Sequence, residues 1–362
     1  MPKLLLLILL FSTPLHAQQT QNLFLIIPDG LRWQEVFRGM DSSMLTKENK
    51  AEPAAPLREA FWFEDLEARR RALMPFLWTT VATEGQIYGN RDKNAPSRVT
   101  NPYHVSYPGY SEVICGFAEF SITNNTKIPN PNVSVFEFLH AKPNFAGKVA
   151  AFGTWDTYPY IFNSLRSGIL VDDGIAPLTR GTLTPTIEAI NTLRKETPRR
   201  WSSAHFDSLS YRAAREWIAA NTPRLCFIGL GETDEWAHEG DYANYLKAAH
   251  RSDAYIRELW DFCQSHPTYK GTTTFIITTD HGRGDHDGGP TAWFNHNAQT
   301  PGCEAIWIAI LGPDTPALGE RRDTSEVTQA QIAATIAALL GEDYNAAEPR
   351  AAKPIAEALP SR

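Results

Sequence analysis

Residues Thr274–Gly282 read TFIITTDHG, a short apolar run that ends in an acidic residue and a histidine. The apolar part, Phe275–Ile277, has the β-branched and aromatic residues of a fully buried strand. Asp280 and His281 follow at once, at the end of a strand, where open α/β sheets bind their ligands. A carboxylate beside an imidazole is also a common pair of metal ligands. On this motif alone, a metal site and a helix cap with an ordinary loop histidine are equally good interpretations.

Two other predicted strands end in the same way. Leu23–Pro28 (LFLIIP) is followed directly by Asp29, and Leu225–Leu230 (LCFIGL) runs into a turn that contains Asp234. Chance would scatter acidic residues along the chain. Because parallel strands end at one edge of a sheet, the pattern predicts that these aspartates meet Asp280 in a single site.

Strands and helices alternate along the rest of the chain. Apolar runs predict further strands at Val81–Tyr88, Val149–Phe152 and Ala305–Leu311. Apolar residues at three- and four-residue spacing predict helices at Leu57–Leu73, His205–Ala220, Leu246–Cys263 and Gln329–Leu340. This alternation is typical of an α/β fold with a mostly parallel central sheet and helices on both faces.

The N-terminus has the features of a secretory signal peptide. Lys3 precedes the apolar run Leu4–Phe11, which is too short to span a bilayer, and a small residue, Ala17, ends the segment. We expect cleavage after Ala17, a periplasmic or secreted protein, and no membrane span after cleavage. Residues 18–341 are then one domain with a small irregular cap near 157–205, and 342–362 form a C-terminal tail.

Composition narrows the class of protein. The 362 residues are 43% hydrophobic and 21% charged, as in ordinary globular proteins. The net charge is −7 and there is no basic tract, which argues against a nucleic-acid groove. The four cysteines are widely spaced without a C-x-x-C pair, so we expect buried free thiols rather than a zinc or redox motif.

Acidic and histidine residues near the strand ends are numerous enough for two metal ions. The candidates are three aspartates and three histidines: Asp29, Asp234, His238, Asp280, His281 and His296. Three ligands for each ion leave open positions for a substrate. Imidazole together with carboxylate favours two Zn²⁺ ions, with Mn²⁺ as the alternative.

A two-metal site with an oxygen nucleophile suits phosphoryl or sulfuryl transfer. The nucleophile should be a Ser, Thr or Cys near a helix N-terminus, where backbone N–H groups help to hold an anion. Residues 101–116, NPYHVSYPGYSEVICG, are the best candidate stretch. They contain two serines, Ser106 and Ser111.

Four motifs, in order, resemble those of one enzyme superfamily. They are the strand ending in PDG, SYPGYSEVICG, TDEWAHEG, and TTDHG followed by His296. The second is similar to T-F-P-N-H-Y-T-x-x-T-G and the third to P-D-x-x-G-H-x-x-G. The chain therefore resembles the alkaline phosphatase superfamily, especially its type I phosphodiesterase/nucleotide pyrophosphatase branch and related secreted bacterial phosphohydrolases. The match runs from Leu23 to about Pro316, and it implies the three-layer alkaline-phosphatase-like fold.

The resemblance also implies roles for individual residues. It places Ser106 at the nucleophile, and Ser111 is the rival because it too lies near a helix start. One metal ion would be held by Asp29, Ser106, Asp280 and His281, and the other by Asp234, His238 and His296. Asn124 resembles the asparagine that contacts the phosphate in the family. The gap before it is two residues shorter here, so Asn125 is an alternative.

The implied activity is hydrolysis of phosphate esters on a small phosphorylated substrate through a phosphoseryl intermediate. Diester or pyrophosphate cleavage is slightly favoured, because a monoesterase needs a strong cation on the free phosphoryl oxygens and none lies beside Ser106. Arg283 and Lys127 are the cations that could change this preference, so a phosphomonoesterase and a phosphotransferase or mutase remain alternatives. A formylglycine sulfatase is less favoured, since Tyr110 stands where C/S-x-P-x-R has arginine. An inactive binding protein is less favoured because all six metal ligands are present.

Overall fold

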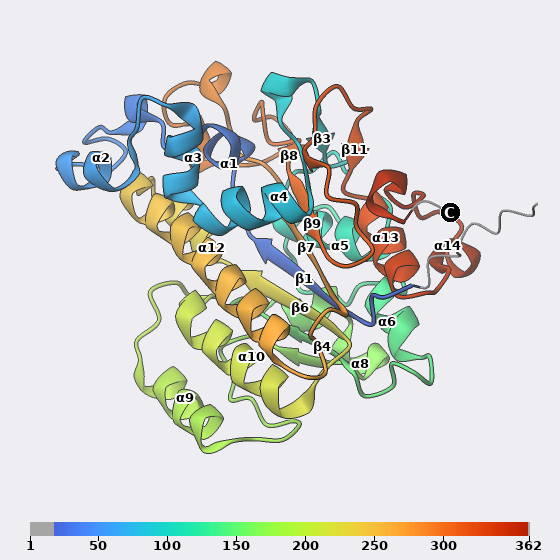
Figure 1. Cartoon of the computed structure of the whole chain (residues 1–362). Coiled ribbons are helices and arrows are strands. Elements are labelled where there is room, and N and C mark those ends of the chain that lie inside the picture. The colour runs from blue at the N-terminus through green and yellow to red at the C-terminus, as the bar shows by residue number, and fades with distance from the viewer. Residues whose placement is uncertain (1–17, 361–362) are drawn as a thin grey trace, which may run out of the picture.

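A parallel sheet carries the strand ends singled out above. The computed structural model describes residues 18–360, except for the side chain of His286 (Figure 1). Its main sheet has eight strands. In spatial order these are β10 (Gly319–Glu320), β2 (Gln86–Tyr88), β9 (Ile308–Leu311), β7 (Thr273–Thr278), β1 (Asn22–Pro28), β6 (Leu225–Leu230), β4 (Val149–Phe152) and β5 (Leu170–Asp172).

Alternate residues of the central strand β1 face opposite sides of the sheet. Phe24 and Ile26 belong to one hydrophobic core cluster, and Leu23, Leu25 and Ile27 belong to another. The strands from β7 to β5 pair in parallel, whereas β9 is antiparallel to both β7 and β2. Both faces are therefore covered, which explains why the strands read as continuous apolar runs.

Helices form the two outer layers. One face is covered by α1 (Trp33–Arg38), α2 (Ala55–Phe61), α3 (Leu66–Leu73), α10 (Asp207–Asn221) and the long α12 (Tyr242–Ser265) (Figure 1). The other carries α5 (Ser106–Cys115), α6 (Val135–His140), α7 (Tyr158–Ile161) and α13 (Gln331–Leu339). The other helices are α4 (Ala82–Glu84), α8 (Ser164–Ser167), α9 (Pro185–Glu196), α11 (Glu232–His238) and α14 (Tyr344–Ala347), and a small second sheet consists of β11 (Val327–Thr328), β3 (Ser97–Arg98) and β8 (Ala305–Ile306). The predicted fold class is confirmed.

Three predicted elements differ from the observed ones. The strand expected at 81–88 is confined to β2, because residues 77–84 are helical and bury Leu77 and Val81 at helical spacing. The strand at 305–311 is split between two sheets at Trp307, whose carbonyl accepts a hydrogen bond from the Thr278 hydroxyl (2.7 Å). The helix at 57–73 is two helices, α2 and α3, and Asp65 caps the second. All four cysteines are buried and free, as predicted.

Two segments expected to be peripheral contribute to the main body. Residues 157–205, expected as an irregular cap, supply the edge strand β5 and helix α9, which packs beside α10. The C-terminal tail buries Tyr344, Ile355 and Ala358 in the core that also holds α13. The predicted signal peptide, 1–17, lies outside the described residues. Within 18–360, no helix is both long and apolar enough to cross a membrane.

Candidate active site

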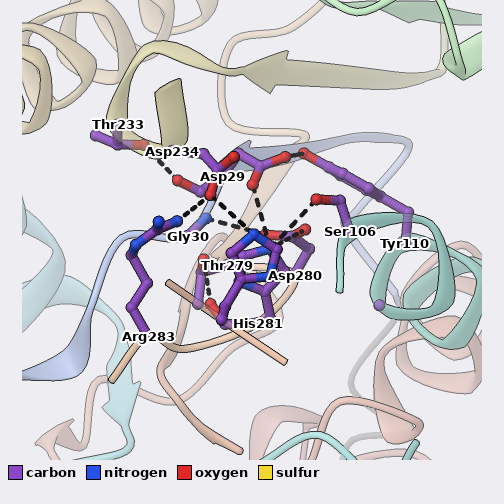
Figure 2. A network of polar contacts seen from close by, with 12 residues as sticks. Asp29, Gly30, Ser106, Tyr110, Thr233, Asp234, Thr279, Asp280, His281 and Arg283 are labelled. Carbon is purple, nitrogen blue, oxygen red and sulfur yellow. Dashed lines mark hydrogen bonds and ion pairs between the residues drawn. The ribbon is translucent and has the colours of Figure 1, made fainter. Parts of the chain in front are cut away.

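The predicted ligands meet at one edge of the sheet. Asp29 directly follows β1, Asp280 lies two residues beyond β7, and Asp234 lies in α11, the helix that begins just after β6. Because β7, β1 and β6 are parallel neighbours, these three carboxylates are brought together (Figure 2). The structure places all seven predicted ligand residues here, in two groups.

The first group consists of Asp29, Ser106, Asp280 and His281. Nε2 of His281 lies 3.3 Å from Oδ2 of Asp280 and 3.5 Å from Oδ1 of Asp29. The Ser106 hydroxyl lies 3.3 Å from the same nitrogen (Figure 2). The backbone N–H of Gly30 donates to Oδ1 of Asp280 (3.0 Å). Gly30 has φ +58°, and a Cβ there would lie 2.9 Å from Asp234, so the turn after β1 requires glycine.

The donor set of this group fits a metal cation. Nδ1 of His281 lies 2.9 Å from the Gly282 carbonyl, so Nδ1 carries the proton and Nε2 presents a lone pair to the carboxylates. Oδ1 of Asp29 and Oδ2 of Asp280 are buried without a hydrogen-bond donor. Acceptor atoms that face one another in a buried site need a positive charge between them.

Without an ion the pKa values in this group are strongly shifted. Burial raises the pKa of Asp29 well above its ordinary value, and the charges of Asp280 and Asp234 add to the effect. Burial, with the charge of Asp234, raises the pKa of Asp280 to about 8. Burial lowers the pKa of His281 to about 3, so this imidazole is neutral and able to act as a ligand.

The second group consists of Asp234, His238 and His296. Nε2 of His238 lies 3.0 Å from Nε2 of His296 and 3.2 Å from Oδ2 of Asp234. Nε2 of His296 lies 3.5 Å from Oδ1 of Asp234, and its Nδ1 lies 2.9 Å from the His104 carbonyl. The rings of His281 and His296 stack with centroids 3.7 Å apart, so the two groups adjoin.

Arg283 lies behind the second group rather than beside the nucleophile. Its guanidinium is fully buried and pairs with Oδ1 of Asp234 (Figure 2). It also donates to the carbonyls of Trp293 and Phe294. Its Nη2 also lies 3.3 Å from Nδ1 of His238. Arg283 thus fixes Asp234 and the loop that leads to His296. Burial opposes ionisation of Asp234, but His238 and Arg283 together hold the pKa of this carboxyl well below its ordinary value.

Ser106 is the first residue of α5, as expected for the nucleophile. The helix approaches β7 closely at Gly109, where a Cβ would lie 2.3 Å from the Asp280 carbonyl, so the glycine that replaces the family's asparagine is required for this packing. The rival Ser111 lies within the buried face of the helix and accepts a hydrogen bond from Asn130 (3.1 Å). Of the two serines, only Ser106 lines the cavity at the site.

Comparison with known proteins agrees with this geometry. The family model of the Metalloenzyme superfamily matches residues 205–343, which carry both ligands of α11 and those of the β7 end. The structure of wild-type alkaline phosphatase PafA aligns with a TM-score of 0.65 over 95% of this chain and 100% of that one, at 10% identity. At this identity the likeness to PafA shows a shared fold, and the match to the Metalloenzyme superfamily covers residues 205–343.

Other members of this fold differ in activity. The lipoteichoic acid synthase LtaP from Listeria monocytogenes aligns with a TM-score of 0.56 and 13% identity, over 90% of this chain and 73% of that one. BT1596, a 2-O GAG sulfatase, aligns with a TM-score of 0.53 and 12% identity, over 94% and 72%. No curated protein sequence matches the chain. The family model that matches residues 205–343 is one of metalloenzymes, and the shared fold leaves the substrate open.

The cavity at the site has a volume of about 180 Å³. Besides Ser106 and ligands from both groups, it is lined by Asn125, Trp155, Ser203 and Glu235. Asn124, the predicted phosphate contact, does not line the cavity. It is exposed, and its Oδ1 accepts a hydrogen bond from the Thr126 N–H (2.9 Å). The geometry therefore favours Asn125, whose Oδ1 accepts from the Tyr107 N–H (2.9 Å) in the first turn of α5.

Two tyrosines that the sequence did not reveal support the first group. The Tyr110 hydroxyl donates to Oδ2 of Asp29 (2.8 Å), and the Tyr158 hydroxyl donates to that of Tyr110 (2.9 Å). Tyr110 occupies the place of the sulfatase arginine. Only spacing could have indicated this role, because Tyr110 follows Ser106 by four residues and therefore lies on the same face of α5. Tyr158 comes from a distant segment, and no local pattern points to it.

Proposed function

We propose that this protein is a two-metal phosphate-ester hydrolase in which Ser106 is the nucleophile, with a preference for phosphodiester or pyrophosphate bonds. The observation that carries the proposal is the place of the Ser106 hydroxyl. It lies at the start of a helix, opens onto a cavity, and is 3.3 Å from Nε2 of His281, beside the two groups of ligands. A hydroxyl in this position can attack a bound phosphoryl group.

The residues present fit two ions. Asp29, Ser106, Asp280 and His281 would hold one, and Asp234, His238 and His296 the other, with imidazole and carboxylate donors that suit Zn²⁺. When bound, the ions would supply positive charge that favours the ionised serine and the departing oxygen.

The residues of the chain supply the remaining functions. Tyr110 and Tyr158 fix the orientation of Asp29. Asn125 has its carbonyl oxygen bound to the Tyr107 N–H, so its amino group is the end that can donate to a phosphoryl oxygen. Ser106 attacks phosphorus in line and the first alcohol leaves. Water then attacks the phosphoseryl intermediate and releases the second product, which restores the serine.

The cavity supports the preference for a monoanionic phosphoryl group. Among the described residues that line it there is no lysine or arginine. The two cations considered from the sequence are engaged elsewhere: Arg283 pairs with Asp234, and Lys127 pairs with Asp156 (2.6 Å). A phosphomonoester dianion would have no side-chain cation for its extra charge.

The test compares 4-nitrophenyl phosphate, bis(4-nitrophenyl) phosphate and 4-nitrophenyl sulfate on zinc-loaded protein. We expect kcat/KM to be at least about tenfold higher for the diester than for the monoester, a difference of about 1.4 kcal/mol in the barrier. The sulfate should be the poorest substrate, and a chelator should abolish all turnover. A higher kcat/KM for the monoester would make the protein a phosphomonoesterase, and sulfate turnover alone would contradict the proposal.

A further inference from the structure

Glu112 is a carboxylate that binds residues 100–105, the arm that leads directly into Ser106. It lies in α5, is completely buried, and does not line the active-site cavity. Its Oε1 accepts hydrogen bonds from the backbone N–H (2.8 Å) and the hydroxyl (2.9 Å) of Thr100. Its Oε2 accepts hydrogen bonds from the backbone N–H (2.8 Å) and the side-chain amide (2.9 Å) of Asn101. Burial raises the pKa of Glu112, and all of these bonds oppose the rise.

Asn101 passes this constraint along the arm. Its Oδ1 accepts hydrogen bonds from the N–H groups of Tyr103 and His104, both at 3.1 Å. His104 has φ +51°, a left-handed conformation that residues other than glycine rarely adopt. Because Oε2 of Glu112 is an acceptor for the Asn101 backbone N–H, the end of the Asn101 amide that it binds is the amino group. Glu112 therefore sets the direction of the amide that holds His104 in this conformation.

The end of the arm contacts one of the predicted metal ligands. The His104 carbonyl accepts a hydrogen bond from Nδ1 of His296 (2.9 Å), and Nδ1 of His104 lies 3.4 Å from the Asn297 carbonyl. Because Nδ1 of His296 carries the proton, its Nε2 is free to act as a ligand beside Asp234. Ser106 follows shortly after His104 in the chain. The arm therefore holds both the nucleophile and a ligand of the second group.

We propose that Glu112 is a positioning residue that fixes, through the arm, the orientation of the His296 ring and the place of the Ser106 hydroxyl. The inference rests on the proposed function. The side-chain hydrogen bonds of Glu112 reach the arm, so its effect on both groups passes through Asn101 and His104. Without this anchor, His104 is free to leave the left-handed conformation, and its carbonyl then turns away from His296.

The first measurement is the affinity of the native protein and of Glu112→Gln for two zinc ions, by competition with a chromophoric chelator. Glutamine keeps the shape of the side chain, but its amino group leaves at least one N–H of the arm facing another N–H. We expect the affinity for the more weakly held ion to fall at least about tenfold, because His296 loses its orientation. The affinity for the other ion should stay within about threefold.

A second measurement observes the His296 ring directly. In the native protein, proton NMR should show a slowly exchanging proton on Nδ1 of His296, because this nitrogen is bound to the His104 carbonyl. The signal is assigned by its absence from His296→Ala. In Glu112→Gln the proton should exchange with water at least about tenfold faster, because the acceptor is no longer held in place.

The kinetic effect should be on kcat. With saturating zinc, Glu112→Gln should lower kcat for bis(4-nitrophenyl) phosphate by about tenfold, with KM within about twofold of the native value. The residues that line the cavity are the same in this variant, and only the attacking oxygen is displaced. Asn101→Ala removes the amide between Glu112 and His104. It should reproduce every effect of Glu112→Gln, and it tests the inference if that variant does not fold.

Asp253→Asn is the matched control for a general loss of stability. Asp253 is also a buried carboxylate, and it accepts hydrogen bonds from the backbone N–H groups of Phe76 (2.7 Å) and Leu77 (2.9 Å). It does not line the cavity. The variant should therefore keep both zinc affinities and the native exchange rate of the His296 proton.

The outcomes separate this inference from the proposed function. If native, zinc-loaded protein does not hydrolyse bis(4-nitrophenyl) phosphate, the proposed function fails, and the role of Glu112 in it fails too. If the diester is hydrolysed but Glu112→Gln and Asn101→Ala keep the native zinc affinities and the native His296 signal, the inference is overturned and the proposed function stands. Equal losses in Asp253→Asn would show a general loss of stability and would likewise overturn the role of Glu112.

Discussion

The two groups of ligands differ in how the fold holds them. Asp280 and His281 are fully buried and follow a core strand, whereas the His238 side chain is 42% exposed on a seven-residue helix. Tyr110 and the Gly30 N–H support the first group with neutral hydrogen bonds. The second group is supported by Arg283, a cation.

This difference shows how each group tolerates the absence of an ion. The first group has carboxylate oxygens without donors, so its negative charges are balanced only by protons or by a metal. In the second group the permanent positive charge of Arg283 lies beside Asp234, so this group is closer to electrical balance without an ion. We therefore expect the first ion to be bound more tightly and to matter more for stability.

The largest effect should come from the nucleophile. Ser106→Ala should lower kcat by at least about a thousandfold, because the attacking oxygen is removed. Ser111→Ala is the matched control, since Ser111 lies on the same helix but does not line the cavity, and it should stay within about threefold of the native rate. The comparison is made with zinc-loaded proteins on bis(4-nitrophenyl) phosphate. Full turnover by the Ser106 variant would refute the mechanism.

The next largest effect is on zinc affinity, and removing one ligand from each of the two groups compares them directly. Asp280→Asn should weaken zinc binding by at least about a hundredfold, and His238→Ala by about tenfold, because water can take the exposed position of His238. Competition with a chromophoric chelator measures both. The metal-free Asp280→Asn protein should fold well, because the change removes the electrostatic repulsion between the buried carboxyl groups of Asp280 and Asp29. Equal losses in both variants would contradict the proposed asymmetry.

A smaller effect is expected from removing the arginine of the second group. Arg283→Met should lower the free energy of unfolding of metal-free protein by about 3 kcal/mol, because Asp234 and two backbone carbonyls lose their donor. The loss should be about 1–2 kcal/mol smaller with zinc, since an ion also balances Asp234. Denaturant unfolding measures both states. Arg194→Met, which breaks a buried pair with Asp172, should cost the same with and without zinc.

The smallest effect is a pH dependence confined to the metal-free state. The folded pKa of Asp280 is about 8, far above the unfolded value, so the folded protein retains a proton that the unfolded chain has released. Stability is therefore lost as pH rises from about 4 to 8. The buried histidines, whose folded pKa values are lowered, oppose this loss only until the unfolded imidazoles have released their protons, within about one pH unit above 6.5.

The measurement is the melting temperature of metal-free and zinc-loaded protein at pH 6.5 and pH 8. Metal-free protein should lose on the order of 1 kcal/mol of stability across this interval. Zinc-loaded protein should show a much smaller change from this group, because a bound ion keeps both carboxylates ionised at either pH. Equal slopes in the two states would show that the carboxylates are not the ligands.

Much of the site could be predicted because its ligands follow local rules. Asp29, Asp234 and Asp280 stand at the ends of apolar runs, and the parallel sheet of an α/β fold brings such ends together. Ser106 could be chosen over Ser111 only through the resemblance to the alkaline phosphatase superfamily. The exposed cavity surface then distinguished the two serines independently.

The remaining features depend on tertiary placement, which has no local signature. Arg283 was considered as a contact for phosphate, yet its side chain turns into the protein toward Asp234 and two carbonyls. Residues Leu77–Val81 are rich in β-branched and aromatic residues, but packing of one face makes them helical. Asn125 rather than Asn124 faces the cavity because Asn125 binds the Tyr107 N–H, a contact that spacing alone does not specify.

The central claim is that the Ser106 oxygen becomes bonded to phosphorus during turnover. Mass spectrometry of peptides from zinc-loaded enzyme, acid-quenched while hydrolysing bis(4-nitrophenyl) phosphate, tests it directly. The account predicts a 4-nitrophenyl phosphoryl adduct on the peptide that contains Ser106, because one nitrophenyl group stays on phosphorus in the first step. Fragmentation should locate the adduct on that residue, and it should be absent from Ser106→Ala. An adduct on Ser111, or turnover at the native rate by a protein that lacks Ser106, would contradict it.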